Sequence, residues 1–269
     1  MIIDFHTHVF PDKIAQSTIS ALQSNSGTKP NTDGTVQGML DAMARANSDI
    51  CVTLPVLTKA SQFDSVLRFA CAVNERFTDA DKRLISFAGM HPQCEDIDGK
   101  MALIKSCGIK GVKIHPDYQN TYIDDKGYIE ILKCAKKYDL IVVTHSGVDD
   151  GFKGEPIKCT PDRILKVIEE VGHDKFVLAH YGSHLMWEEV LDKLAGKNVY
   201  FDTAFTLHEI SESLFKAIIY KHGADKVLFA TDCPWRDIKD DVDILKSYNL
   251  DKETEDKIFY KNALKLLGI

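Results

Sequence analysis

Met1-Ile2-Ile3-Asp4-Phe5-His6-Thr7-His8 opens the sequence and decides between two architectures for the chain. Its β-rich run over residues 2–5, apolar except for Asp4, has the composition of a short buried strand. A doubly wound open sheet would usually place a glycine-rich phosphate-binding turn directly after such a strand. Because His6-Thr7-His8 stands there instead, the opening favours a closed α/β barrel over an open sheet.

The rest of the chain repeats a β-then-α pattern. Eight β-rich runs occur in all, and helical periodicity follows them; over residues 62–77, for example, Phe63, Leu67 and Ala70 fall on one face. Eight such units in about 250 residues are the content of a (β/α)8 TIM barrel. No linker rich in Pro, Gly or Ser divides the chain, so we predict a single domain over residues 1–269. The runs are residues 2–5, 50–54, 84–88, 111–114, 140–144, 176–179, 199–201 and 227–230.

Composition and charge narrow the class of partner. The chain carries 33 basic and 40 acidic residues, a net charge of −7, which argues against binding to nucleic acid or to anionic membranes. We therefore expect a small-molecule substrate. No signal-peptide pattern or long apolar run occurs, and the seven cysteines form no CxxC pair, so we predict a cytoplasmic protein with reduced thiols. We expect a homodimer, although no sequence motif indicates the oligomeric state.

Two segments outside the predicted strands have structural interpretations. Residues 24–34 (SNSGTKPNTDG) form a polar loop in the first βα connection, where either an active-site flap insertion or a passive surface insertion would fit. The closing segment, residues 251–269, places Ile258, Ala263, Leu264 and Leu267 at helical spacing. We expect this last segment to pack on the barrel exterior.

The predicted strands end in polar residues. In a barrel, catalytic groups come from the carboxyl ends of the strands and the loops after them. Six of the ten histidines stand at such ends, and we assign the other four (His173, His184, His208 and His222) to the surface or to helix caps. In chain order the residues at the strand ends are His6, His8, His91, His115, His145, His180, Asp202 and Asp232.

His6 and His8 are one residue apart on an extended segment, so their side chains point to the same side. Two imidazoles can bind one cation, with zinc–nitrogen distances of about 2.0–2.1 Å and one or two further ligands. His145 and Asp232 are the candidates for these further ligands, and Asp202 could support a metal ligand without contacting the metal itself. A pair of histidines can also be merely hydrogen-bonded to each other, but the cluster at the other strand ends favours a metal site.

Six motifs make the chain resemble the amidohydrolase superfamily, specifically the amidohydrolase 2 (amidohydrolase-related) family, which includes proteins similar to aminocarboxymuconate-semialdehyde decarboxylase. The likeness spans nearly the whole length. It implies a metal-dependent barrel enzyme in which His6, His8, His145 and Asp232 hold the metal and His180 orients or activates the attacking water. The motifs are DFHTHVFP at 4–11, GVKIHP at 111–116, THSG at 144–147, LAHYG at 178–182, VYFDT at 199–203 and ATDCPW at 230–235.

The chemistry expected of such a site is hydrolysis. A divalent cation lowers the pKa of water from 15.7 toward about 7, and Asp232 or His180 would take the proton. We expect cleavage of a C–N or C–O bond in a small, carboxylate-bearing substrate. The resemblance also implies an alternative, a lyase that acts as a non-oxidative decarboxylase or hydratase on an aromatic or unsaturated acid. A barrel that keeps the metal only for structure or sensing is a third interpretation, and strand-end ligands disfavour it.

The number of metal ions and the substrate contacts stay open. Lys113 and His115 share parity on the fourth strand, so both could face the lumen. The resemblance implies that, with two ions, a carboxylated Lys113 bridges them and completes the set with His145 and His180. With one ion, Lys113 is a lumen charge and His115 a substrate contact. We favour one ion, most simply Zn2+, although manganese, iron or cobalt suits the same ligands. Trp235 could stack on a substrate ring and Arg236 could pair with its carboxylate. Their alternatives are a loop anchor and a solvated charge.

Overall fold

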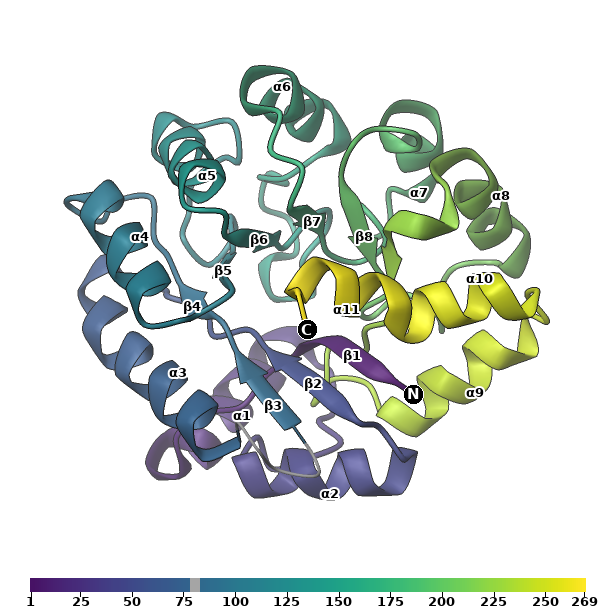
Figure 1. The fold of residues 1–269 in the computed structure, drawn as a ribbon, viewed down its shortest axis with the longest axis horizontal. Helices are drawn as coiled ribbons and strands as arrows, with labels where there is room; N and C mark the ends of the chain where they lie inside the picture. The colour runs from purple at the N-terminus through teal and green to yellow at the C-terminus, as the bar shows by residue number, and fades with distance from the viewer. Residues whose placement is uncertain (78–82) are drawn as a thin grey trace.

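The computed structural model describes residues 1–77 and 83–269 and shows a (β/α)8 barrel, with a ring of strands inside a ring of helices (Figure 1). Each predicted run overlaps a strand, and the third run is divided between two short strands on either side of Phe87. The strands are β1 Ile3–Thr7, β2 Ile50–Thr53, β3 Arg83–Ser86, β4 Ala88–Gly89, β5 Gly111–Ile114, β6 Ile141–Thr144, β7 Phe176–Leu178, β8 Tyr200–Asp202 and β9 Val227–Leu228.

All strand pairs are parallel, and backbone hydrogen bonds complete the ring. β1, β2 and β3 pair in that order, and β4 through β9 pair in chain order. Between the first and last strands, Phe5 N–H donates to Phe229 O at 2.9 Å and Asp232 N–H donates to His6 O at 2.8 Å. The predicted barrel is therefore confirmed.

The helices follow the strands, with one additional helix in the first connection. That helix, α1 (Asp12–Ser26), precedes α2 (Val36–Ala46), which packs against α9 in the outer ring. No described helix is both long and apolar enough to cross a membrane. The other helices of the ring are α3 Phe63–Phe77, α4 Ile97–Ser106, α5 Lys126–Lys137, α6 Pro161–Val171, α7 Trp187–Glu189 with a π-helical turn at Val190–Leu194, α8 Glu212–His222 and α9 Ile238–Ser247.

The polar segment 24–34 is only partly a loop, because its first three residues form the last turn of α1. The hydroxyls of Ser24 and Ser26 donate to the carbonyls of Ser20 and Leu22 one turn earlier, which accommodates serine in a helix. Gly27 then ends the helix with a φ of 77°. The prediction that this segment acts as a flap is left as a prediction.

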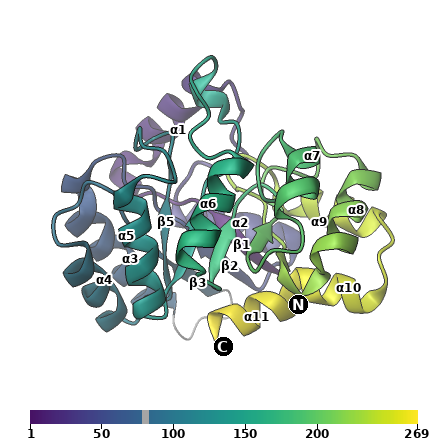
Figure 2. The same ribbon diagram turned by 90° about the horizontal axis from the view of Figure 1, so that it is seen from above.

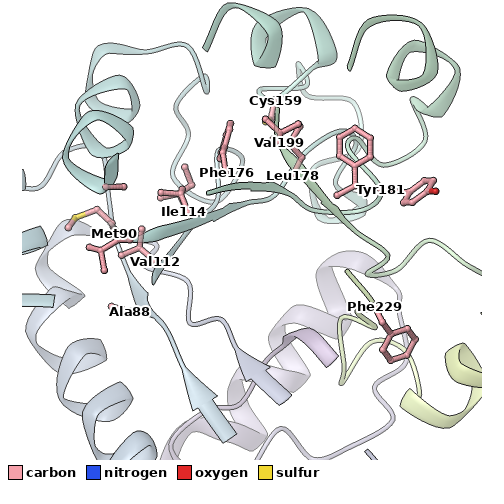
Figure 3. Packing of buried hydrophobic residues seen from close by; sticks show 14 of the residues in the cluster. Ala88, Met90, Val112, Ile114, Cys159, Phe176, Leu178, Tyr181, Val199 and Phe229 are labelled. Atoms are coloured by element: carbon pink, nitrogen blue, oxygen red, sulfur yellow. The ribbon is translucent and has the colours of Figure 1, made fainter. Parts of the chain in front are cut away.

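Two apolar clusters stabilise the barrel. The outer cluster lies between strands and helices, and Figure 3 shows its side chains Val112, Ile114 and Leu178 on the strands. The inner cluster fills the lumen with side chains such as Phe5 and Val143, both fully buried. The lumen is thus a packed core, as expected for eight strands, and the polar site is confined to one end of it.

The closing segment corrects our expectation of purely exterior packing. It consists of α10 (Lys252–Asp256), a π-helical turn (Lys257–Lys261) and α11 (Asn262–Leu267). The turn does pack outside, in the outer cluster, but Ala263, Leu266 and Leu267 of α11 belong to the inner cluster. α11 lies across the amino-terminal end of the strands (Figure 1), where no other described helix covers the lumen. Helical spacing alone could not distinguish the two surfaces, since both are apolar.

A β-bulge explains how β1 serves both the core and the site. Ile3 and Phe5 pack in the inner cluster, yet the next residue, His6, also faces the interior. Strict alternation would point one of these neighbours outward. The pairing of β1 with β2 shifts register between Asp4 and Thr7, which supplies the extra residue that a bulge needs. The first strand therefore turns from apolar core to histidine cluster within one residue.

Candidate metal centre and active-site cavity

A cavity of about 500 Å3 opens at the carboxyl ends of the strands. Histidines and charged residues line its deep end, and segments around α1 and α3 line its outer part. α1 sits at this end of the barrel, opposite α11 and both chain termini (Figure 2). The lining at the deep end includes His6, His8, Lys113, His115, His145, His180, His184 and Asp232. Most of the residues singled out at the strand ends therefore meet in one place.

Three of the predicted metal ligands converge. His6, His8 and Asp232 offer ligand atoms within 4.8 Å of one another. Asp232 Oδ1 lies 2.9 Å from His8 Nε2 and 3.4 Å from His6 Nε2. Ligands at zinc-like bond lengths in a tetrahedral site would stand about 3.3 Å apart, so the spacing fits a single divalent cation.

Hydrogen bonds on the far sides of the two imidazoles locate their protons. His6 Nδ1 donates to Asp202 Oδ2 at 2.9 Å, and His8 Nδ1 donates to the carbonyl of Leu54 at 2.8 Å. In the neutral rings both Nε2 atoms are therefore unprotonated, and they face the Asp232 carboxylate. Lys113 Nζ donates to His6 Nε2, but His8 Nε2 and Asp232 Oδ1, 2.9 Å apart, repel each other as two acceptors unless a cation or a proton lies between them. The donor set fits a divalent metal, with the outer hydrogen bonds that histidine ligands usually make.

Asp202 also holds the backbone of the site. Its Oδ1 accepts from His180 N–H at 3.0 Å and from Ala204 N–H at 3.1 Å. His180 has a φ of 59° and Asp232 a φ of 70°, a left-handed conformation that is unfavourable for residues with a side chain. The predicted supporting role of Asp202 thus has a geometric basis, since one buried carboxylate fixes both the His6 ring and the His180 backbone.

Electrostatics at the deep end favour neutral histidines beside an ionised Asp232. Burial lowers the pKa of His6 and His145 well below the usual range, and that of His180 to about 4. Burial by itself would favour the neutral acid at Asp232, but His6 and His8 outweigh it and lower the pKa of this carboxyl. Unprotonated imidazoles and a carboxylate are the forms that bind a metal.

Lys113 lies beside the triad. Its side chain is 1% exposed, and its Nζ donates to His6 Nε2 at 3.0 Å. Burial lowers the pKa of this amine to about 8, against the opposing effect of Asp202 and Asp232. Lys113 and His115 both line the cavity, as their shared parity predicted. Whether Lys113 becomes carboxylated and bridges a second ion stays a prediction.

His145, the fourth predicted ligand, does not join the triad in the structure. His180 Nδ1 donates to the Ala204 carbonyl at 2.9 Å, so His180 Nε2 accepts from His145 Nδ1, also at 2.9 Å. These two hydrogen bonds leave His145 Nε2 unprotonated, and this atom has no hydrogen-bond partner among the described residues. The atom is chemically able to ligate a metal, but it faces Asp117 Oδ2 at 3.8 Å. Its ligand role stays a prediction.

A second group, His115, His145 and Asp149, also has ligand-like spacing. The positions of the ring protons in this group are less suitable for binding a metal. Tyr118 N–H donates to His115 Nδ1 at 3.4 Å, which places the ring proton on Nε2. That nitrogen lies 3.5 Å from Asp149 Oδ2, an arrangement of donor and acceptor. The His6, His8 and Asp232 group is therefore the better candidate for a metal centre.

His184, like Asp149, is a cavity residue that the sequence pattern did not indicate. Its side chain is 4% exposed, it lines the cavity, and both ring nitrogens lack hydrogen-bond partners in the described part of the chain. Assignment of His173, His184 and His222 to the surface was wrong, because all three are buried. His184 follows the strand-end residue His180 by four positions, and a compact loop brings it back over the strand ends; the bridge between Gly147 and His184 fixes this return.

The two predicted substrate contacts after Asp232 lie in different places. Trp235 lines the cavity. Arg236 is not among the described lining residues; its guanidinium pairs with Glu209 at 2.6 Å and lies 3.8 Å over the ring of Phe205, which does line the cavity. His91 is also outside the described lining, and its Nδ1 accepts from Gln93 N–H at 3.1 Å. The substrate roles of Trp235 and Arg236 stay predictions.

Comparison with solved structures supports the fold. A TIM-barrel protein from Bordetella bronchiseptica superposes with a TM-score of 0.79 at 17% identity, over 99% of this chain and 98% of the other. A probable 2-pyrone-4,6-dicarboxylic acid hydrolase from Acinetobacter baumannii, with citric acid bound, gives 0.71 at 16% identity over 100% and 99%. A dihydroxybenzoic acid decarboxylase from a Polaromonas species, with manganese and the inhibitor 2-nitroresorcinol bound, gives 0.73 at 15% identity over 99% and 96%.

Comparison with sequences identifies the family. No curated protein matches the sequence. The sequence model of the amidohydrolase family matches residues 3–269, from the first strand to the last residue. This span contains the histidine pair, the strand-end aspartates and the whole barrel. The chain therefore belongs to the amidohydrolase family.

Proposed function

We propose that the protein is a divalent-metal-dependent hydrolase that cleaves a C–N or C–O bond of a small, carboxylate-bearing substrate. One observation carries the proposal: His6 Nε2, His8 Nε2 and Asp232 Oδ1 converge with their lone pairs at ligand spacing while the protons of both imidazoles are held on the opposite side. When bound, a cation such as Zn2+ or Mn2+ supplies Lewis acidity that makes water nucleophilic near neutral pH.

The residues around the cation site have the properties that hydrolysis needs. Asp232 is ionised and can accept a proton from attacking water and return it to the leaving group. His180 is neutral at pH 7, since burial lowers its pKa to about 4, and its ring is fixed by Ala204 O and His145. Lys113 supplies a buried positive charge on the cavity wall that suits a substrate carboxylate.

Decarboxylation is the second candidate. It is favoured by the Polaromonas neighbour, whose description names dihydroxybenzoic acid decarboxylase with bound manganese. A cation beside a lysine can hold an aromatic acid as readily as an amide or a lactone, so the two reactions share most of their requirements. Proton delivery to a ring carbon would replace attack by water.

The test uses the full chain loaded with Zn2+ or Mn2+. We expect turnover of carboxylate-bearing amides, esters or lactones, and no release of carbon dioxide from 2,6-dihydroxybenzoate or muconate-type acids. Carbon dioxide release without hydrolysis of any amide, ester or lactone would replace the proposal with the lyase.

Matched variants test the metal assignment. His6→Ala and Asp232→Asn should lose bound metal, measured by elemental analysis, and at least about 100-fold of the turnover, because each removes a ligand. His173→Gln is the control, since His173 is buried away from the cavity with Nε2 against the Leu140 carbonyl. Full metal content and full turnover in His6→Ala or Asp232→Asn would contradict the assignment.

A further inference from the structure

The cavity divides by charge into two parts. Every charged or histidine side chain in its lining comes from the strand ends or from the loops after β6 and β7. The segments 10–28 and 55–69 contribute fourteen lining residues and none of them is charged: Phe10, Pro11, Ile14, Thr18, Leu22, Ser26, Thr28, Pro55, Val56, Thr58, Gln62, Ser65, Val66 and Phe69. We call this outer part the apolar arm.

α1 is built to supply one wall of the apolar arm. Ala15 and Ile19 are buried, Ile19 lies beside Gly34, and the helix contacts the turn Asp150–Phe152 in the loop after β6. Ile14, Thr18 and Leu22 recur every four residues on a neighbouring stripe, so they line the cavity together. The Ile14 side chain is 48% exposed. A helix inserted before the ring helix α2 thus holds apolar surface at the cavity and leaves it accessible.

The facing wall comes from the segment after β2 and from α3. Val56 and the α3 residues Val66 and Phe69 line the arm, and all three are only partly buried. Val66 and Phe69 are three positions apart, so they lie on one face of the helix. Two helices therefore present apolar stripes to one continuous space that ends at the histidine cluster.

We propose that the apolar arm binds an alkyl or aryl group of the substrate, so that the substrate is an amphiphilic carboxylic acid derivative rather than a compact polar acid. This inference rests on the proposed function in one respect, namely which end of the ligand reacts. The occupant is argued from the cavity itself: the arm is continuous with the histidines and Lys113, the two parts differ in charge, and the volume of about 500 Å3 falls within the range of sites for drug-sized ligands.

The test measures binding and needs no turnover. Acetate, butyrate, hexanoate and octanoate are titrated by calorimetry into the zinc-loaded full-length protein. We expect one site per chain and a Kd that falls about three- to fourfold for each added methylene, as apolar burial predicts. A Kd that is independent of chain length would overturn the proposal and would indicate an arm open to solvent or covered by another chain.

Variants locate the effect. Leu22→Asn and Val66→Asn should flatten the dependence of the Kd on chain length. Leu103→Asn, a change at a leucine that is 45% exposed on α4, is the matched control and should keep the wild-type dependence. Unchanged dependence in both arm variants, or equal flattening in the control, would overturn the proposal.

His6→Ala separates this inference from the proposed function. It should weaken binding of all four acids by the same factor and keep the dependence on chain length. If no amide, ester or lactone is hydrolysed but the Kd still depends on chain length, the proposed hydrolysis is wrong and the proposed role of the apolar arm is supported. Loss of the dependence on chain length in an enzyme that hydrolyses small carboxylate-bearing amides, esters or lactones refutes the apolar arm alone.

Discussion

At the scale of single residues, Asp202 has the widest effect on the site. One oxygen accepts the proton of His6 Nδ1, and the other accepts the backbone N–H groups of His180 and Ala204. Asp202 is not among the described residues that line the cavity, so it acts by positioning other residues. It fixes which nitrogen of His6 carries the proton, and thereby which nitrogen can bind a metal.

Asp202→Asn tests this positioning. The amide oxygen can still accept from His180 N–H and Ala204 N–H, but the NH2 group would then face His6 Nδ1, and two donors cannot pair. His6 would move its proton to Nε2 and lose its ligand lone pair. We expect metal affinity to fall by roughly 10- to 100-fold, measured by competition with a chelator, while circular dichroism stays unchanged. Wild-type affinity in Asp202→Asn would show that the His6 tautomer is not controlled in this way.

At the residue level, the sequence allowed us to predict which side chains lie close together where chain position and chemistry coincide, while their roles stay predictions. His6 lies at the end of β1, His8 directly follows this strand and Asp232 comes after the last strand; parallel strands of a barrel bring such positions to one end. His184 could not be recognised, because its place over the strand ends depends on the path of a loop. Likewise the pairing of Arg236 with Glu209 depends on side chains 27 positions apart in separate loops.

At the scale of elements, α11 is the clearest departure from expectation. Strands were recognised because short β-rich runs bounded by helical periodicity have few alternatives. Sequence does not show whether a terminal helix packs on the outside of the barrel or across its end. Periodicity identifies the apolar face of the helix, but the outer and inner clusters that could receive this face are both apolar. α11 closes the lumen at the end that has no site, with Leu267 only 2% exposed.

Leu267→Ala tests this closure. Removing a buried leucine side chain leaves a cavity, so we expect the free energy of unfolding to fall by about 2–4 kcal/mol in chemical denaturation. Leu103→Ala on the exposed side of α4 should change it by less than about 0.5 kcal/mol. Equal, small losses in both variants would mean that α11 does not complete the inner core. Turnover of the folded Leu267→Ala protein should be close to that of the wild type, since the site lies at the other end.

At the scale of the whole molecule, the barrel separates stability from chemistry. The inner cluster fills the amino-terminal part of the lumen, and the polar site occupies the carboxyl end. The net charge of −7 belongs to the chain as a whole and does not describe the cavity, where Lys113 and a cation would add positive charge. The cavity lining also carries the carboxyl groups of Asp149, Asp150 and Asp232, which Lys113 and a bound cation would offset locally.

Removal of the metal tests this separation. A ligand that binds only the folded protein stabilises it by about 4 kcal/mol at a thousandfold excess over Kd. Chelation should thus lower the thermal midpoint by several degrees and abolish turnover, while circular dichroism at 25 °C shows a retained barrel. Added Zn2+ or Mn2+ should restore both properties. Unfolding of the chelated protein at 25 °C would instead indicate that the cation is needed for folding.

Both chain termini lie beside α11, at the end of the barrel opposite α1 (Figure 2). A surface, a resin or a partner enzyme joined to Met1 or Ile269 would consequently hold the molecule with its cavity facing outward. Such an anchored enzyme should admit substrate as freely as the enzyme in solution.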